Sequence, residues 1–305
     1  MQFASFTLIF LFLPITMLLF YLTPNRWKRE VMLGISLLFL CSGGWLAAAV
    51  EILLTALTYG AGLLLEHLRQ RKHFSRLVLT GSILLHFGAL LLLRSDWLFS
   101  LKAGWFSGKS LFPLGLAFFT LQSVGYCIDV FRGKIHGEKN WRQLGLYLLF
   151  YPRLIMGPVV SYSVAVKSLC TPVFDIARVG QGLLRFLVGL GKKLILANWL
   201  GMLFRTLCQA DTGTYSLMLV WLGAFAQLMT LYLELSGFAD MAIGLGLCYG
   251  VRLPESFGKS LFYPSMAAFA DQWNRTVVQW FSHYVGTHFR GKNHFLYLFA
   301  MLATW

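Results

Sequence analysis

Apolar residues fill most of this chain in long stretches, which short polar and basic segments separate. A run of about 20 apolar residues crosses the hydrocarbon core of a bilayer as one α-helix. The region 31–65 is longer than one crossing needs, and Ser42, Gly43 and Gly44 divide it, so it predicts two helices with a tight turn. The other membrane-crossing helices predicted in the first part of the chain are 3–22, 77–93 and 111–130.

The second part of the chain has a less regular apolar pattern. Short or interrupted helices at membrane depth are tolerated only where protein or a water-filled cavity surrounds them. We therefore expect the second part to build a cavity and the first part to act as its scaffold. Longer helices are predicted over 179–200 and 215–233, and short or broken ones over 145–150, 239–249 and 269–285.

Composition assigns the chain to the integral membrane proteins. Hydrophobic residues make up 57% and charged residues only 12%, whereas soluble domains carry roughly 25% charged residues. The formal charge of +14 does not indicate nucleic-acid binding, because the basic residues gather in short segments between apolar runs. Membrane lipids are the expected surroundings. Basic loops favour the cytoplasm, so the segments 23–30, 67–76 and 132–142 predict a multi-pass topology with the N-terminus outside the cytoplasm.

A cluster of polar residues interrupts the apolar segment LYLELSGFAD. Polar groups at membrane depth are costly and mark a candidate site. Glu234 and Asp240 are six residues apart, a spacing that does not bring two side chains together on one helix. If they are to converge, the helix must break at Ser236 and Gly237. The alternative is a polar hinge whose acids pair with Arg and Lys on neighbouring helices.

A second candidate lies in DQWNRTVVQW, where Asn274 follows Trp273. A side-chain amide donates to and accepts from a substrate carbonyl or hydroxyl. The alternative is an interfacial helix whose aromatic residues and Asn274 face lipid headgroups. His283 and His288 flank this segment, but their spacing of five does not stack them on one helix face. No metal-binding pattern appears in the sequence, and neither a metal nor a bound cofactor is expected.

Several segments, taken in order, resemble the membrane-bound O-acyltransferase (MBOAT) family. The similarity is to its bacterial branch, which includes alginate O-acetylation and teichoic-acid D-alanylation proteins. The matching segments are PLGLAFFTLQSVGYCIDVFRG (113–133), YPRLIMGPV (151–159), GLGKKLILAN (189–198), LELSGFADMAIGLGLCYGVRLPESF (233–257) and WNRT (273–276).

The resemblance implies an all-α polytopic membrane protein, an MBOAT-like helical cone with re-entrant or broken helices. It implies one integral membrane domain over 1–305, with a transmembrane scaffold over 1–110 and an incomplete catalytic core over 111–305. The implied activity transfers an acyl group, expected to be acetyl, from a cytoplasmic acyl-CoA or acyl-carrier thioester to a hydroxyl of a cell-envelope polysaccharide. The implied location is the bacterial inner membrane, and periplasmic envelope-modification proteins are the implied partners.

The resemblance also implies residue roles. Asn274 is the expected catalytic contact, which hydrogen-bonds a substrate or the developing oxyanion but does not shuttle a proton. Lys192 and Lys193 are expected at the donor mouth, drawing phosphates towards it; snorkelling to headgroups is the alternative. The expected substrate-binding residues are Glu234, Ser236, Asp240 and Trp273.

The chain departs from the family at its end. The family's general base is the histidine of a Trp-His-Gly motif, and Trp305 resembles the tryptophan of that motif. We therefore expect the front part of a longer acyltransferase, inactive by itself without the histidine. Two other functions stay open: a non-catalytic membrane scaffold of envelope biosynthesis, and a transporter or export channel with a polar cavity.

Overall fold

The computed structural model describes residues 5–94, 115–154, 156–170, 175–209, 216–258, 264–265, 268–269 and 272–285. Every regular element in these ranges is helical. Four of the helices are long and apolar enough to cross a membrane. The predicted class, an all-α polytopic membrane protein, is confirmed. The four candidate spans are Trp45–His67, Lys72–Leu93, Ile176–Gln209 and Leu217–Cys248.

The first part of the chain is helical where its apolar pattern predicts, but two helices predicted to cross the membrane, Thr7–Leu22 and Leu116–Phe131, are shorter than the four candidate spans. Gly44 forms the turn between α2 and α3 with a φ of 145°, a conformation that only glycine adopts without strain. The predicted division of the long apolar region into two helices is thus confirmed. The elements are η1 (Thr7–Phe12, a π-helix), α1 (Leu13–Leu22), η2 (Asn25–Trp27), α2 (Lys28–Gly43), α3 (Trp45–His67), α4 (Lys72–Arg94) and α6 (Leu116–Phe131).

Short helices follow, again as predicted. The side chain of Asn140 caps the first of them by accepting a hydrogen bond of 3.1 Å from the backbone N–H of Arg142, as asparagine commonly does at a helix start. These elements are α7 (Trp141–Leu149), α8 (Tyr151–Leu154) and α9 (Tyr162–Cys170).

Two long helical runs dominate the second part. The first is continuous from α10 (Ile176–Gly191) through the π-helical η3 (Lys192–Ala197) to α11 (Asn198–Gln209). The second is α12 (Leu217–Cys248), and α14 (Arg275–Tyr284) is a short helix beyond it.

The break at Ser236 and Gly237 that convergence of Glu234 and Asp240 would require is absent, because α12 runs through both residues without interruption. The segment 239–249, predicted to be a separate short helix, belongs almost entirely to the same long helix. The physical reason is that Gly237 serves close packing and not a bend. A Cβ placed at Gly189 of α10 would lie 2.5 Å from the carbonyl oxygen of Gly237, so the small residues let two backbones approach.

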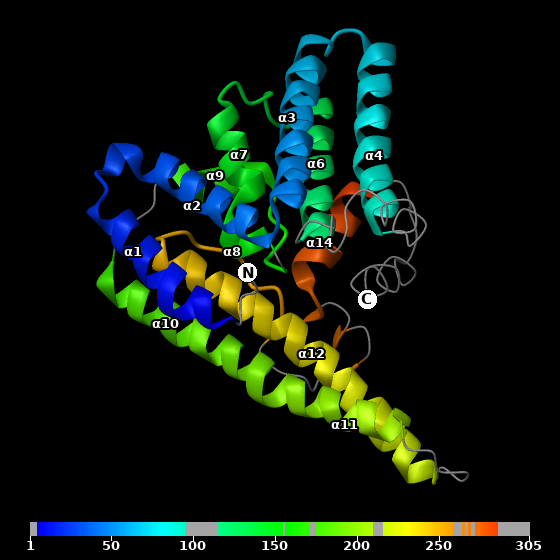
Figure 1. The fold of residues 1–305 in the computed structure, drawn as a ribbon. Coiled ribbons are helices and arrows are strands. Elements are labelled where there is room, and N and C mark those ends of the chain that lie inside the picture. Colours follow the sequence, from blue (N-terminus) through cyan, green and yellow to red (C-terminus); the bar gives the residue numbers. More distant parts are fainter. Residues whose placement is uncertain are drawn as a thin grey trace.

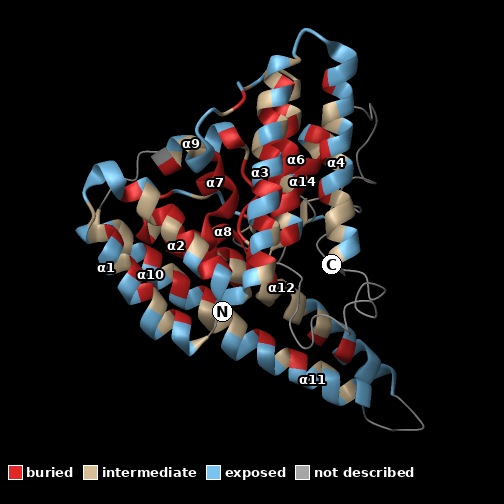
Figure 2. Ribbon diagram, turned by 45° about the horizontal axis from the view of Figure 1, so that its top comes forward, coloured by how far each residue is buried: buried red, intermediate tan, exposed pale blue. Residues whose placement is uncertain are grey.

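The long pair made of α10–α11 and α12 lies along one side of the molecule, while α3, α4 and α6 stand together on the other side (Figure 1). Buried residues concentrate in α6, α7, α8 and α14, whereas α4, α10 and α11 turn many exposed residues outwards (Figure 2). The outward apolar residues suit contact with lipid. The division into a scaffold over 1–110 and a core over 111–305 stays a prediction.

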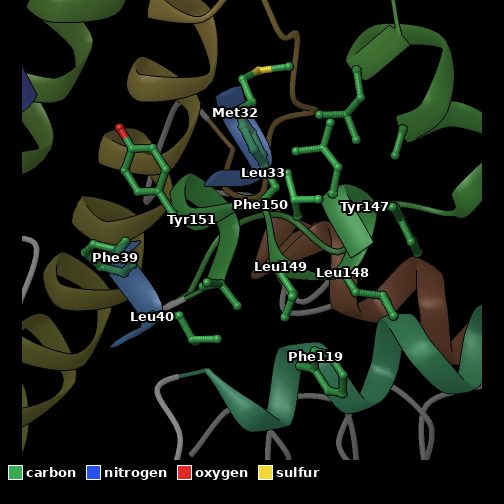
Figure 3. Close-up of a cluster of buried hydrophobic side chains, with 14 of the residues drawn as sticks. Met32, Leu33, Phe39, Leu40, Phe119, Tyr147, Leu148, Leu149, Phe150 and Tyr151 are labelled. Carbon is green, nitrogen blue, oxygen red and sulfur yellow. The ribbon is translucent and has the colours of Figure 1, made fainter. Parts of the chain in front are cut away.

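Aromatic and aliphatic side chains of α2, α6, α7 and α8 form the central core (Figure 3). Within it the hydroxyl of Tyr151 donates to that of Tyr249 over 3.1 Å, and Tyr249 in turn lies 2.9 Å from the Thr16 hydroxyl. These contacts join α8 to α1 and to the residue that ends α12, so the core connects the two parts of the chain.

The three basic segments lie at the same end of the helices. Nδ1 of His136 is 2.9 Å from the Glu66 carboxylate, and Arg69 donates to the carbonyl of Gly133 over 3.3 Å. Arg29 and Arg142 line one shared hollow. Their meeting at one end agrees with the topology that the charge pattern predicts, while the side of the membrane stays a prediction.

Candidate functional site

Ion pairs connect the predicted polar cluster of α12 to the π-helical segment η3. Lys192 Nζ lies 2.6 Å from Asp240 Oδ2, and the ammonium of Lys193 pairs with Glu234. The two acids therefore bind neighbouring lysines and do not converge on each other. The alternative prediction, that these acids pair with basic residues of a neighbouring helix, is confirmed, whereas the hinge is absent. Both lysines are compensated by carboxylates, and their role at a donor mouth stays a prediction.

Arg185 extends this ion-pair ladder towards α14. Its guanidinium lies 2.9 Å from Asp240 Oδ1 and also pairs with Glu255. No local pattern indicates that Arg185 and Glu255 pair, because they are 70 positions apart in the chain. Ser236 is 2% exposed, and its hydroxyl has no hydrogen-bond partner among the described residues. The indole N–H of Trp273 also has no partner there, so Ser236 and Trp273 are the members of the predicted set that retain unused hydrogen-bonding capacity.

Asn274 stands at the start of α14 in the left-handed conformation, with a φ of 44°. Asparagine tolerates this conformation better than most residues, and such outliers cluster at functional sites. Its side chain does not cap α14 and is 4% exposed, so the alternative in which Asn274 faces headgroups is wrong. Trp273 is also buried, with its ring centroid 5.8 Å from that of Tyr232 on α12 and 5.9 Å from that of Phe257.

The segment between α12 and α14 ties the ladder to Asn274. Ser256 directly follows Glu255, and its carbonyl accepts a hydrogen bond of 2.7 Å from the N–H of Arg275. The structure thus brings the predicted residues of α12 and those at the start of α14 into one neighbourhood. Whether they act on a substrate stays a prediction.

A hollow of about 210 Å³ runs along one face of α14. It faces the segment 159–161, and its helix residues are spaced as one face of an α-helix requires. Thr276, at one end of this face, accepts a hydrogen bond of 3.2 Å from the N–H of Val159. The lining residues are Val159, Ser161, Thr276, Gln279, Trp280, His283 and Tyr284.

Basic side chains from the loop after α6 contact the two residues at the other end of this hollow, His283 and Tyr284. Lys134 Nζ lies 2.6 Å from Nε2 of His283. Arg132 donates to the carbonyls of His283 and Tyr284 over 3.3 Å and 3.2 Å. The Tyr284 hydroxyl donates to Asp129 over 2.7 Å, and burial together with this hydrogen bond holds the pKa of Tyr284 well above its usual value.

His283 and Lys134 were missed as a pair by sequence reasoning, because they are 149 positions apart. The available signal was the polar face of α14, where Thr276, Gln279 and His283 recur at helical spacing. The partner of His283 comes from the loop after α6 and not from its own helix.

Several known proteins are similar in sequence to this chain. No protein-family model matches the chain. It is 28% identical over 299 residues to the probable alginate O-acetylase AlgI of Azotobacter vinelandii, covering 93% of this chain and 59% of that protein. The AlgI of Pseudomonas putida (strain KT2440) is 30% identical over 302 residues, with 93% and 60% covered. The peptidoglycan O-acetyltransferase of Helicobacter pylori (strain 26695) is 25% identical over 205 residues, with 57% and 38% covered.

The helical membrane fold and these relatives define the class: the chain is similar to membrane acyltransferases of bacterial envelope polymers. The predicted resemblance to the bacterial branch of the membrane-bound O-acyltransferases is confirmed. The chain spans about 60% of the length of the alginate O-acetylases that it matches.

Proposed function

We propose that the protein carrying this chain is a membrane O-acetyltransferase that modifies hydroxyl groups of a cell-envelope polysaccharide. The observation that carries this proposal is similarity over 93% of the chain to proteins named alginate O-acetylases. A peptidoglycan O-acetyltransferase is also among the relatives, and both names join O-acetylation to an envelope polymer. The acetyl donor is a cytoplasmic thioester, either acyl-CoA or an acyl-carrier protein.

In the proposed reaction the acceptor oxygen attacks the thioester carbonyl carbon, the carbon–sulfur bond breaks, and the thiol leaves. Negative charge develops on the carbonyl oxygen, where a preorganised donor is most effective. The side-chain amide of Asn274 has N–H groups that can donate to this oxygen, and it makes no capping hydrogen bond to α14. Asn274 has no titratable proton, so the base that receives the hydroxyl proton is another group.

The residues of α12 support this site in two ways. Glu234 and Asp240 hold α10, η3 and α12 together through their ion pairs, which fixes one wall beside Trp273. Ser236 has a buried hydroxyl with no partner in the described part of the chain. Buried polar groups are nearly always hydrogen-bonded, so we assign this hydroxyl to the acceptor polysaccharide.

The proposed location is the bacterial inner membrane, with the basic loops in the cytoplasm and the N-terminus on the periplasmic side. In that orientation the donor arrives at the basic end of the helices, where three loops meet. Periplasmic envelope-modification proteins are the proposed partners on the acceptor side.

The test is transfer of a labelled acetyl group by the purified protein in lipid nanodiscs. Labelled acetyl-CoA or acetyl-carrier protein is supplied with an unmodified envelope polysaccharide, and label in the polymer is counted. Ester-linked label that mild alkali releases supports the proposal. Passage of polymer across vesicles without labelling would establish the export channel, and assembly with envelope proteins without labelling would establish the scaffold.

A further inference from the structure

Lys134 differs from the lysines of η3 in the chemistry of its partner. Lys192 and Lys193 each meet a carboxylate, whereas the partner of Lys134 is the imidazole of His283, 2.6 Å away. An ammonium group only donates, so Nε2 of His283 is the acceptor in this contact. The positive charge of Lys134 is therefore not cancelled by an acid within the described chain.

Lys134 is not itself a lining residue, but its ammonium group contacts His283, which lines the hollow along α14. His283 lines the hollow together with Gln279 and Ser161, which offer an amide and a hydroxyl. Arg132 adds a second cation at the same end, where it satisfies the last carbonyls of α14. Asp129 is buried, and its carboxylate accepts a hydrogen bond from the Tyr284 hydroxyl. Gln279 and Ser161 in the hollow, with the cations beside it, thus offer neutral and charged donors, a combination suited to a phosphate.

The size of the hollow restricts the ligand further. Its volume of about 210 Å³ is below the roughly 300–1,000 Å³ of a pocket that encloses a drug-sized molecule. It accommodates a phosphate and the first part of an attached chain. The rest of a longer ligand must lie outside the hollow.

We propose that this hollow binds the phosphate of the phosphopantetheine arm that acyl-CoA and acyl-carrier proteins share. The inference rests on the proposed function, since it places the donor of that reaction. Lys134 binds the phosphate as a point charge, and Gln279 and Ser161 donate hydrogen bonds to it.

The position of the hollow agrees with this assignment. His283 and Asn274 stand near opposite ends of α14, and nine residues of helix span about 14 Å. An extended pantetheine arm covers a comparable length. A phosphate held beside Lys134 therefore lets the thioester reach the neighbourhood of Asn274.

The test compares binding of 4′-phosphopantetheine and pantetheine, which differ only in the phosphate, to the full protein in phosphatidylcholine nanodiscs by titration calorimetry. We expect at least about tenfold tighter binding of the phosphorylated arm, a difference of about 1.4 kcal/mol. Lys134→Met abolishes this preference. The matched control Lys72→Met removes an exposed lysine of another basic loop and retains it.

Equal affinity for the two arms, or a preference that survives Lys134→Met, would overturn the assignment. Replacing part of the lipid by phosphatidylglycerol identifies the other source of phosphate. If anionic lipid removes the preference of the unaltered protein, the hollow binds lipid headgroups and the donor assignment is wrong.

The binding test is independent of the reaction itself. Acetyl transfer with an unchanged KM for the thioester in Lys134→Met contradicts the phosphate site and leaves the proposed function standing. Selective phosphopantetheine binding by a protein that transfers no acetyl group contradicts the proposed function and leaves the phosphate site standing.

Discussion

Gly189 of α10 and Gly237 of α12 touch through their backbones. A Cβ at Gly189 would lie 2.5 Å from the carbonyl oxygen of Gly237, and a Cβ at Gly237 would lie 2.9 Å from that of Gly189. Gly182 and Gly244 repeat the relationship two turns away, with a distance of 2.6 Å in each direction. The seven-residue spacing on both helices keeps these glycines on the shared face of an antiparallel pair.

Substitution of a glycine at this contact between α10 and α12 is expected to destabilise the protein. Gly189→Ala forces the helices apart, and overpacking of this kind costs about 1–3 kcal/mol. Thermal unfolding in detergent measures the change. Gly180→Ala is the matched control, since a Cβ there has no atom within 4 Å. Because alanine favours helix more than glycine does, the control should be as stable as the unaltered protein or more stable by up to about 1 kcal/mol. Equal effects of the two substitutions would contradict the close packing of α10 and α12 at Gly189.

The charge of Asp240 is expected to stabilise the wall between α10 and α12. Asp240→Asn leaves Lys192 and Arg185 without this carboxylate, whose side chain is 17% exposed. We expect a loss of about 2 kcal/mol, between the effects for exposed and buried ion pairs, measured by thermal unfolding.

The control for this charge is Asp175→Asn. Asp175 pairs with Arg178 in a more exposed setting and also caps α10, a role that asparagine retains. Its expected effect is below about 0.5 kcal/mol. If Asp175→Asn lowers the stability as much as Asp240→Asn, the ion pairs of Asp240 stabilise the protein no more than an exposed pair does.

The hydroxyl of Tyr284 is expected to anchor α14 to α6. Tyr284→Phe leaves the buried Asp129 without its donor, which costs about 1–3 kcal/mol. Tyr59→Phe removes a more exposed hydrogen bond to the carbonyl of Lys139 and should cost less. Denaturant or thermal unfolding separates the two, and a larger loss for Tyr59→Phe would argue against the anchor.

Much of the fold could be predicted from local patterns. Apolar run lengths located the helices of the first part, and the glycine at position 44 located a turn. Whether the helix breaks at Gly237 could not be predicted, because a glycine inside a helix has the same local appearance whether it bends the chain or allows close packing of a neighbour. The neighbour, Gly189, comes from another segment, which local patterns do not reveal.

The candidate site shows the same limit. Its acids and Asn274 stand out in the sequence because polar groups are rare among apolar residues. The partner of His283 does not stand out, since Lys134 is one of several basic residues in its loop. Pairing across the chain depends on how the helices pack, and packing is decided by contacts between distant segments.

The central claim is that Asn274 contributes directly to acetyl transfer, and the rate of labelled acetyl transfer by Asn274→Ala tests it. Loss of one oxyanion donor lowers turnover about 100-fold or more, so we expect that decrease with unchanged insertion and folding. The exposed Asn198 of α11 supplies the control, Asn198→Ala, which should retain the full rate. Transfer by Asn274→Ala at the rate of the unaltered protein would contradict the account.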